Sequence, residues 1–266
     1  RSLNYYTTSP TLITTIGGGF NSWSIVSAGQ SYSLAINTNG QLYGWGLNNL
    51  GQLAQPTDTV ARSSPVQIGS GTSFASVKAG NSTAFAISNT NLLYGWGQQA
   101  VGQLNIGGTG TDTVARSSPT QIGTSSWTQV SIWASNVNAI ASDGRLYAWG
   151  LGTNGQTGDN TATTKSSPTL VRSLNYATTS PSQIQASGSW SIVSAGQSYS
   201  AAIKTDGSLW TWGLNNAGQL GQVTAANLSG DTFNRSSPTQ IGNTSWSKVT
   251  AGTSATLAIT TLGQLY

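Results

Sequence analysis

Residues 23–53 read WSIVSAGQSYSLAINTNGQLYGWGLNNLGQL, and this stretch decides the fold. Apolar and polar side chains alternate in residues 24–28 and again in residues 32–38, which is the period expected of β-strands. Asn39-Gly40 separates the second run from residues 41–46, and an Asn-Gly pair between alternating runs is a strong hairpin signal. A loop rich in Gly and Asn follows, and a further strand begins with Ser-Ser-Pro at Pro65. The stretch therefore predicts a unit of about four short antiparallel strands.

The same unit recurs along the chain. An aromatic residue before the first strand recurs at intervals of 51, 53, 63 and 56 residues, at Trp23, Phe74, Trp127, Trp190 and Trp246. A Trp-Gly pair recurs as well, and its tryptophans are Trp45, Trp96, Trp149 and Trp212. Repeats of this length with four strands each are typical of a β-propeller, whereas the repeats of the alternative, a flat β-solenoid, are shorter. We therefore expect an all-β propeller without long helices, in which the four Trp-Gly tryptophans are buried between blades.

The repeated motifs resemble those of a known family. Residues 190–196 read WSIVSAG, residues 206–213 read DGSLWTWG, residues 216–221 read NAGQLG and residues 236–241 read SSPTQI. This succession is similar to the RCC1 repeat, named after the regulator of chromosome condensation, and the resemblance covers essentially the whole chain. It implies an RCC1-like β-propeller of four-stranded antiparallel blades, usually a ring of seven.

The predicted domain is a single propeller over residues 1–266. Its four full repeats lie at about 23–73, 74–126, 127–189 and 190–245, with partial repeats at 1–22 and 246–266. We expect residues 246–266 to supply the first three strands of a unit and residues 9–13 the last strand of one. These parts could complete one shared blade of a five-bladed ring, or they could be the ends of a seven-bladed ring. Because the chain starts without Met and stops partway through a motif, we expect either a processed product or an excerpt of a longer polypeptide, and we favour the excerpt.

Departures from the family pattern supply the candidate binding residues. Family repeats usually carry His shortly after the Ala-Gly pair, but this position holds Tyr32, Thr83, Asn136, Tyr199 and Ala255. In the third unit Ile132-Trp133 replaces Ala-Gly, so a large ring stands where a glycine is usual. The candidates for ligand binding are therefore Tyr32, Tyr199, Trp133 and Asn136. The alternative is that all four only pack inside the blades.

Composition excludes most catalytic chemistry. The chain has no His, Cys or Met, and charged residues make up only 6% of it. An imidazole base, a thiolate, a disulfide and an ordinary zinc site are therefore all missing, and we predict no catalytic residue, metal or cofactor. The net charge of +4 is spread thinly along the chain, so we predict no nucleic-acid surface. The sequence contains no run of 18 apolar residues, so we predict no membrane span.

Acidic residues recur in the loop before each Ser-Ser-Pro. Asp58, Asp112 and Asp231 each stand four residues before an arginine, namely Arg62, Arg116 and Arg235. We interpret each pair as a contact that fixes its loop rather than as a site. The founding member of the RCC1 family is a nucleotide-exchange factor for a small GTPase and binds chromatin. The resemblance places those roles on acidic and His residues and a basic tail. Since this chain has neither His nor Glu, we do not expect nucleotide exchange here.

Two functional hypotheses remain, both without catalysis. In the first, the chain is an extracellular recognition module of a phage or virus fibre or of a bacterial surface adhesin. Its low charge, hydroxyl- and amide-rich surface and aromatic rings suit a protein or glycan receptor. In the second, the propeller is an intracellular scaffold that docks a partner protein through its loops. In both cases we expect the chain to belong to a larger polypeptide or assembly.

Overall fold

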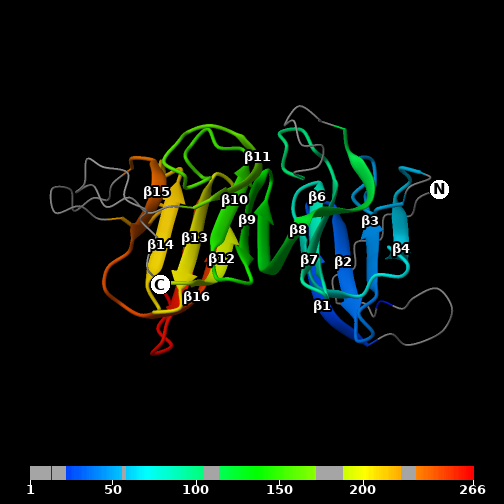
Figure 1. The fold of residues 1–266 in the computed structure, drawn as a ribbon, viewed down its shortest axis with the longest axis horizontal. Helices are drawn as coiled ribbons and strands as arrows, with labels where there is room; N and C mark the ends of the chain where they lie inside the picture. The colour runs from blue at the N-terminus through cyan, green and yellow to red at the C-terminus, as the bar shows by residue number, and fades with distance from the viewer. Residues whose placement is uncertain (1–12, 14–21, 56–57, 105–113, 172–187, 223–231) are drawn as a thin grey trace, which may run out of the picture.

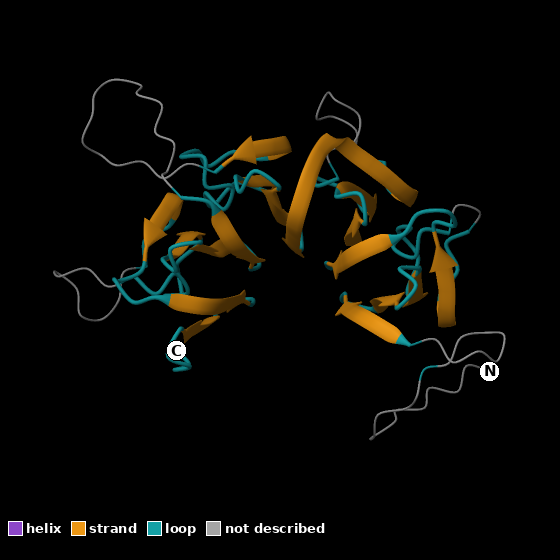
Figure 2. Cartoon of the chain, turned by 60° about the horizontal axis from the view of Figure 1, so that its bottom comes forward, coloured by secondary structure: helices purple, strands orange, loops and turns teal. Residues whose placement is uncertain are grey.

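The structure is a computed structural model that describes residue 13 and residues 22–55, 58–104, 114–171, 188–222 and 232–266. These residues form seventeen strands and no helix, which confirms the all-β prediction (Figure 1). Within them, no helix is long and apolar enough to cross a bilayer. The strands form small antiparallel sheets that follow one another in an open arc (Figure 2).

The first blade shows how the repeat builds a sheet. Its strands are β1 (Trp23–Ala28), β2 (Tyr32–Asn37), β3 (Leu42–Gly46) and β4 (Arg62–Ile68), in this spatial order. At the Asn39-Gly40 turn, Gly40 has φ +77°, the left-handed conformation that the hairpin signal predicts. The proline of Ser-Ser-Pro lies inside the edge strand β4, where its missing N–H is tolerated. The predicted four-stranded unit is therefore present.

The later blades repeat this arrangement. The second contains β5 (Phe74–Ala79), β6 (Thr83–Ser88) and β7 (Leu92–Gly97), and the third contains β9 (Asn136–Ala141), β10 (Leu146–Gly150) and β11 (Lys165–Leu170). The fourth contains β12 (Trp190–Ala195), β13 (Tyr199–Lys204), β14 (Leu209–Gly213) and β15 (Arg235–Gln240). A partial fifth blade contains β16 (Trp246–Ala251) and β17 (Thr256–Thr260).

One long strand joins the second and third blades. β8 (Arg116–Trp133) first pairs with β7 as the outer strand of the second blade. From Trp127 onward it pairs with β9 as the inner strand of the third blade. The two blades consequently form one seven-stranded sheet, a continuity that the sequence did not indicate.

The blades are held together by the Trp-Gly tryptophans. Trp96, Trp149 and Trp212 are fully buried, as predicted. Each indole Nε1 donates a hydrogen bond to a backbone carbonyl of the preceding blade, that of Gln52, Gln103 or Gln156, at 2.8–2.9 Å. These three glutamines are the ones that follow glycine in the repeat, so the Gly-Gln loop of one blade accepts the tryptophan of the next.

The Gly-Gln loop is itself fixed by side-chain amides. In the first blade the Gln52 side chain accepts a hydrogen bond from Leu50 N at 2.8 Å, and Asn48 Oδ1 accepts one from Leu53 N at 2.9 Å. The fourth blade repeats both contacts through Gln219 and Asn215. The Asn and Gln of the repeated motif therefore shape the loop that receives the neighbouring indole.

For Trp45 the prediction of burial between blades is wrong. It is only half-buried, because the described residues place no blade before the first one. It lines a hollow of about 340 Å³ together with Ile13, Trp23, Val26 and Leu34, on the outer face of the first blade. Ile13 is the one described residue of the strand predicted at residues 9–13, and the rest of that prediction lies outside the described residues. The sequence also repeats residues 1–13 almost unchanged at residues 172–184, and this second copy lies outside the described residues as well.

The C-terminal residues begin a further blade. Beyond β17 the chain turns back at Gly263, and Ala258 and Tyr266 exchange two backbone hydrogen bonds of 2.9 Å. The Tyr266 ring meets Trp246 edge to face at 5.5 Å. The same edge-to-face contact joins Trp23 to Tyr43 and Trp127 to Tyr147, so residues 246–266 keep the register of the earlier blades.

Candidate recognition site at the inner loops

Five short loops meet where the innermost strands end. Each lies where the first strand of a blade gives way to its second. Residues 29–31, 80–82 and 196–198 connect the two strands, and the equivalent segments are residues 133–135, which include the last residue of β8, and residues 252–254. The first strands of neighbouring blades contact one another, which brings the five loops together at the inner edge of the arc. We call these segments the inner loops.

The inner loops have a fixed backbone. In the first blade Gly29 N donates to Tyr32 O at 2.8 Å, and Ser31 O accepts a hydrogen bond from Leu47 N at 2.8 Å. The blades with Gly80 and Gly196 repeat both contacts at 2.8 Å. Gly46, which follows Trp45, has φ +104°, and a Cβ there would lie 2.6 Å from Ser31 O. The Trp-Gly glycine is therefore needed for the close approach of strand and loop.

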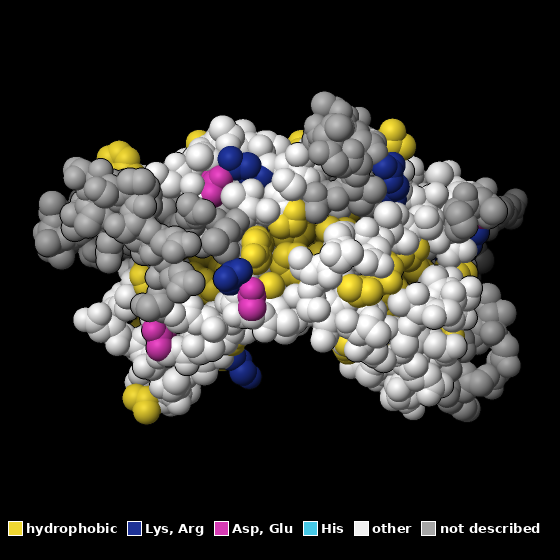
Figure 3. Space-filling model, in the orientation of Figure 1, with side chains coloured by type: hydrophobic (Ala, Val, Ile, Leu, Met, Phe, Trp, Pro, Cys, Tyr) yellow, Lys and Arg dark blue, Asp and Glu magenta, His cyan; other side chains and the backbone are white. Residues whose placement is uncertain are grey.

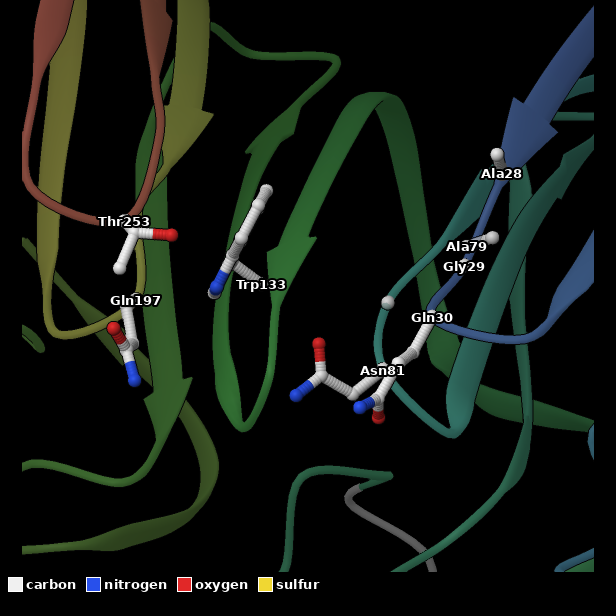
Figure 4. A pocket seen from close by; sticks show the side chains of 9 residues that line it. Ala28, Gly29, Gln30, Ala79, Asn81, Trp133, Gln197 and Thr253 are labelled. Atoms are coloured by element: carbon white, nitrogen blue, oxygen red, sulfur yellow. The ribbon is translucent and has the colours of Figure 1, made fainter.

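A hollow of about 370 Å³ opens among the inner loops. Four of its lining side chains belong to the exposed middle residues of their loops, which are Gln30, Asn81, Gln197 and Thr253. Trp133 faces the same space from the third blade (Figure 4). The backbone around Ala28-Gly29 and Ala79-Gly80 completes the wall. The hollow therefore draws on all five blades, with three amides, one hydroxyl and one indole. We call it the inner pocket.

The inner pocket is uncharged. Among the nine described residues that line it, none carries a charge. Charged side chains are also sparse over the molecular face shown in Figure 3. The pocket therefore offers neutral hydrogen-bonding groups and an aromatic ring, without a field that would attract an ion.

Trp133 is the exposed member of the predicted set. Its exposed fraction is 36%, and it ends β8 at the position of Gly29 in the first blade. At Gly29 a Cβ would lie 2.1 Å from the Tyr32 ring, which folds back across the glycine. In the third blade Asn136 replaces that tyrosine and leaves the space open. The small residue at 136 thus makes room for the large one at 133.

The other three predicted binding residues lie in the interior. Tyr32, Asn136 and Tyr199 have exposed fractions of 3%, 0% and 0%. Tyr32 Oη donates to Thr83 O at 2.8 Å, Tyr199 Oη donates to Ala255 O, and Asn136 Nδ2 donates to Tyr199 O at 2.9 Å. Each contact reaches the equivalent residue of the next blade. Their side chains therefore join blades in this structure, which is the alternative considered for them, and do not line the inner pocket.

Burial also sets the titration of the two tyrosines. Desolvation raises the pKa of Tyr32 far above its usual value, although its hydrogen bonding to the backbone at Gly80 acts in the opposite direction. Desolvation likewise raises the pKa of Tyr199, against hydrogen bonds that involve Thr256 and Gly252. Both side chains are therefore neutral donors at physiological pH, which suits a contact between blades.

The acidic residues of the outer loops have the expected role where they are described. Asp58 Oδ2 and Arg62 Nη2 form an ion pair of 2.6 Å, and Asp58 Oδ1 accepts a hydrogen bond from Val60 N at 3.0 Å. The contact fixes the loop before β4, as interpreted from the sequence. Asp112 and Asp231 lie outside the described residues.

Four residues of the pocket were not predicted from the sequence: Gln30, Asn81, Gln197 and Thr253. A signal was present, because each stands immediately after the repeated glycine and before a serine. Their alignment across blades could have grouped them, but only the arc of blades shows that they share one hollow.

The fold and these repeated contacts define an RCC1-type propeller, and comparison with known families agrees. The Regulator of chromosome condensation (RCC1) repeat matches residues 39–87, 143–203 and 206–259, which is more than half of the chain. A second form of the same repeat matches residues 23–52 and 190–219. The chain belongs to the RCC1 repeat family.

Similar curated proteins are much longer than this chain. The chain is 27% identical over 217 residues to the ultraviolet-B receptor UVR8 of Arabidopsis thaliana, covering 81% of this chain and 45% of the receptor. It is 26% identical over 215 residues to the human probable E3 ubiquitin-protein ligase HERC4, covering 80% of this chain and 19% of the ligase. The chain therefore spans less than half the length of these relatives.

Solved structures share the fold. Human WBSCR16 superposes with a TM-score of 0.75 at 21% identity, over 92% of this chain and 59% of that protein. Prp20p of Saccharomyces cerevisiae, described with its binding to Gsp1p and histones, superposes with a TM-score of 0.73 at 18% identity, over 92% and 57%. At these sequence identities the comparison shows a shared fold and nothing more.

Proposed function

We propose that this chain is a non-catalytic recognition propeller that binds a partner protein at the inner pocket. The observation that carries the proposal is the position of Trp133. Its indole is partly exposed at a position where the other four blades have glycine, and it faces a hollow that is lined by residues of all five blades. An exposed aromatic ring surrounded by amides suits a polypeptide, whose apolar side chains pack on the ring while its backbone pairs with the amides. The protein-binding relatives support a protein as the partner.

A neutral glycan is the second candidate, and the same pocket favours it. The apolar face of a sugar ring can stack on an indole, and its hydroxyls can pair with Gln30, Asn81 and Gln197. Composition alone supports the extracellular setting, as a fibre or adhesin domain, whereas the ligase relatives support an intracellular scaffold. The reading frame that contains the chain separates these settings. A secretion signal or fibre segment would support the first, and a catalytic or signalling domain the second.

The experiment selects peptides that bind the chain and then asks whether their binding depends on the inner pocket. Random short peptides displayed on phage are selected on the wild-type chain, and the enriched peptides are then measured on Trp133→Gly, which restores the glycine of the other blades. Leu262→Ser is the matched control, because Leu262 is 85% exposed in a hairpin at the other end of the strands.

We expect enriched peptides to bind Trp133→Gly at least about tenfold more weakly, since an interfacial Trp is a common hot spot. Leu262→Ser should bind them as the wild type does. Peptides that bind all three proteins equally would reject the inner pocket. A neutral oligosaccharide on a glycan array that binds in a Trp133-dependent manner, with no peptide enriched, would replace the protein partner by a glycan.

A further inference from the structure

A hollow of about 420 Å³ opens between the fourth blade and the partial fifth blade. Its apolar lining comes from both blades: Leu209, Leu220 and Ile241 in the fourth, Trp246 and Ala258 in the fifth. None of the described residues that line it carries a charge. Its volume lies within the range of pockets that hold organic ligands. We call it the fifth-blade hollow.

The repeat places an equivalent site one blade earlier, and there a tryptophan fills it. Trp212 is fully buried between the third and fourth blades, in one cluster with Leu146, Val171, Trp190 and Ala202. Each of these four residues has its equivalent, one repeat later, in the lining of the fifth-blade hollow: Leu209, Ile241, Trp246 and Ala258. The sequence has no Trp-Gly pair in the fifth blade, so no equivalent of Trp212 stands among these side chains.

Two equivalent glycines show the difference between the sites. At Gly158, two residues after Gln156, a Cβ would lie 2.7 Å from Nε1 of Trp212. At Gly221, two residues after Gln219, a Cβ would have no described atom within 4 Å. The space that the Trp212 indole fills in one site is therefore open in the other, among the residues that the structure describes.

A hydrogen-bond acceptor for an indole is also in place. Gln156 O accepts two hydrogen bonds, from Trp212 Nε1 at 2.9 Å and from Ser200 Oγ at 3.3 Å. The equivalent Gln219 O accepts one at 2.8 Å from Thr256 Oγ1, the counterpart of the Ser200 hydroxyl. Within the described part of the chain, no donor takes the place of the Trp212 indole there. Because a carbonyl oxygen has two lone pairs, Gln219 O can accept a second hydrogen bond.

We propose that the fifth-blade hollow binds the tryptophan side chain of an extended segment of a partner protein. The occupant follows from the molecule itself, because Trp96, Trp149 and Trp212 fill the equivalent sites and each donates to the equivalent carbonyl. An indole combines a large apolar ring with one N–H donor. It therefore matches an uncharged, apolar hollow that offers a carbonyl acceptor.

The edge of β17 can receive such a segment. In the fourth blade Trp212 lies on β14 opposite Ser200 of β13, and Thr256 has the place of Ser200 in β17. Tyr266 pairs with Ala258, two residues further along β17. No described strand covers this edge of β17 beside Thr256. A segment that adds here as a strand would carry its tryptophan into the hollow as β14 carries Trp212.

Titration with the capped peptide Thr-Trp-Gly-Leu, the sequence of residues 211–214, tests the proposal. Amide NMR resonances of the isotope-labelled chain report the binding, and we expect those of Gly221 and Thr256 to shift. The peptide Thr-Ala-Gly-Leu lacks the ring and should bind at least about tenfold more weakly. A third peptide, with a methyl group on the indole nitrogen, keeps the ring without the donor and should bind several-fold more weakly.

A variant tests the site from the side of the chain. Ala258→Phe places a ring in the hollow and should weaken binding of the tryptophan peptide at least about tenfold. Val60→Ser is the matched control, because Val60 is 59% exposed in the first blade, and it should bind as the wild type does. If Ala258→Phe does not fold, the three peptides on the wild type decide the question.

Equal binding of the tryptophan and alanine peptides would overturn the proposal. A tryptophan peptide that shifts neither Gly221 nor Thr256 at millimolar concentration would do so as well. Shifts confined to the inner loops would also overturn it but would support the inner pocket, so the two sites can fail separately.

Discussion

At the scale of single residues, tryptophans of the same sequence lie in different surroundings, and these surroundings distinguish the buried blade contacts from the exposed ring. Trp149 is fully buried and donates a hydrogen bond to the preceding blade, whereas Trp45 has the same place in the repeat but is only half-buried. Trp133 lies outside this pattern and faces the inner pocket. The same residue type therefore serves as a blade contact or as an exposed ring according to what lies next to it.

Trp149→Ala should lower the free energy of unfolding by about 3–5 kcal/mol, because it leaves a large cavity and an unpaired carbonyl at Gln103. Trp45→Ala should cost clearly less, since Trp45 is half-exposed. Urea unfolding of both variants provides the comparison. Equal losses, or a loss below about 1 kcal/mol for Trp149→Ala, would show that the assigned blade packing is wrong.

Because the side chains at residues 133 and 136 compete for one space, we expect substitutions at these two positions to have non-additive effects on the free energy of unfolding. Asn136→Tyr should destabilise the chain by about 1–3 kcal/mol, since a tyrosine folded as Tyr32 is would meet the Trp133 side chain. Adding Trp133→Gly restores the glycine–tyrosine combination of the first and fourth blades and should recover most of the loss. Unfolding free energies of the two single variants and the double variant give the coupling energy. Additive losses would mean that residues 133 and 136 do not share this space.

At the scale of elements, much could be predicted from the sequence. The alternating runs, the Asn39-Gly40 turn and the Ser-Ser-Pro strand starts all lie where they were expected. β8 could not be foreseen, because nothing between Arg116 and Trp133 distinguishes one long strand from two. The burial of Tyr32 and Tyr199 was also hidden, since it depends on a ring folding back over the glycine three residues earlier.

The outer loop of the third blade should carry a pH-dependent part of the stability. Burial pushes the pKa of Asp159 upward, but hydrogen bonds from Lys165, Thr161 and Thr157 outweigh it and hold the pKa below its usual value. A lowered pKa in the folded state means stabilisation that is present above the unfolded pKa of about 3.9 and is lost as the pH falls through the folded value. Melting temperatures of the wild type and Asp159→Asn should therefore differ most above about pH 4 and converge below it. A constant difference across this range would contradict the assignment.

At the scale of the whole molecule, the near absence of charge predicts how the proposed recognition depends on salt. Ten basic and six acidic residues over 266 positions leave the inner pocket without a charged lining side chain. Affinity for a selected peptide should consequently change little between about 50 mM and about 500 mM salt, because neutral contacts are scarcely screened. Titration calorimetry at both concentrations measures this. A fall of about a hundredfold would mean that an ionic surface carries the binding.

Hydrogen exchange of the chain with and without a selected peptide tests most directly whether the inner pocket is the recognition site. The prediction is slower exchange on binding at the five inner loops that surround the pocket, residues 29–31, 80–82, 133–135, 196–198 and 252–254. The hairpin turns at Gly40, Gly144 and Gly207, at the opposite end of the strands, should exchange as before. Protection confined to those turns or to the outer loops, with the inner loops unchanged, would contradict it.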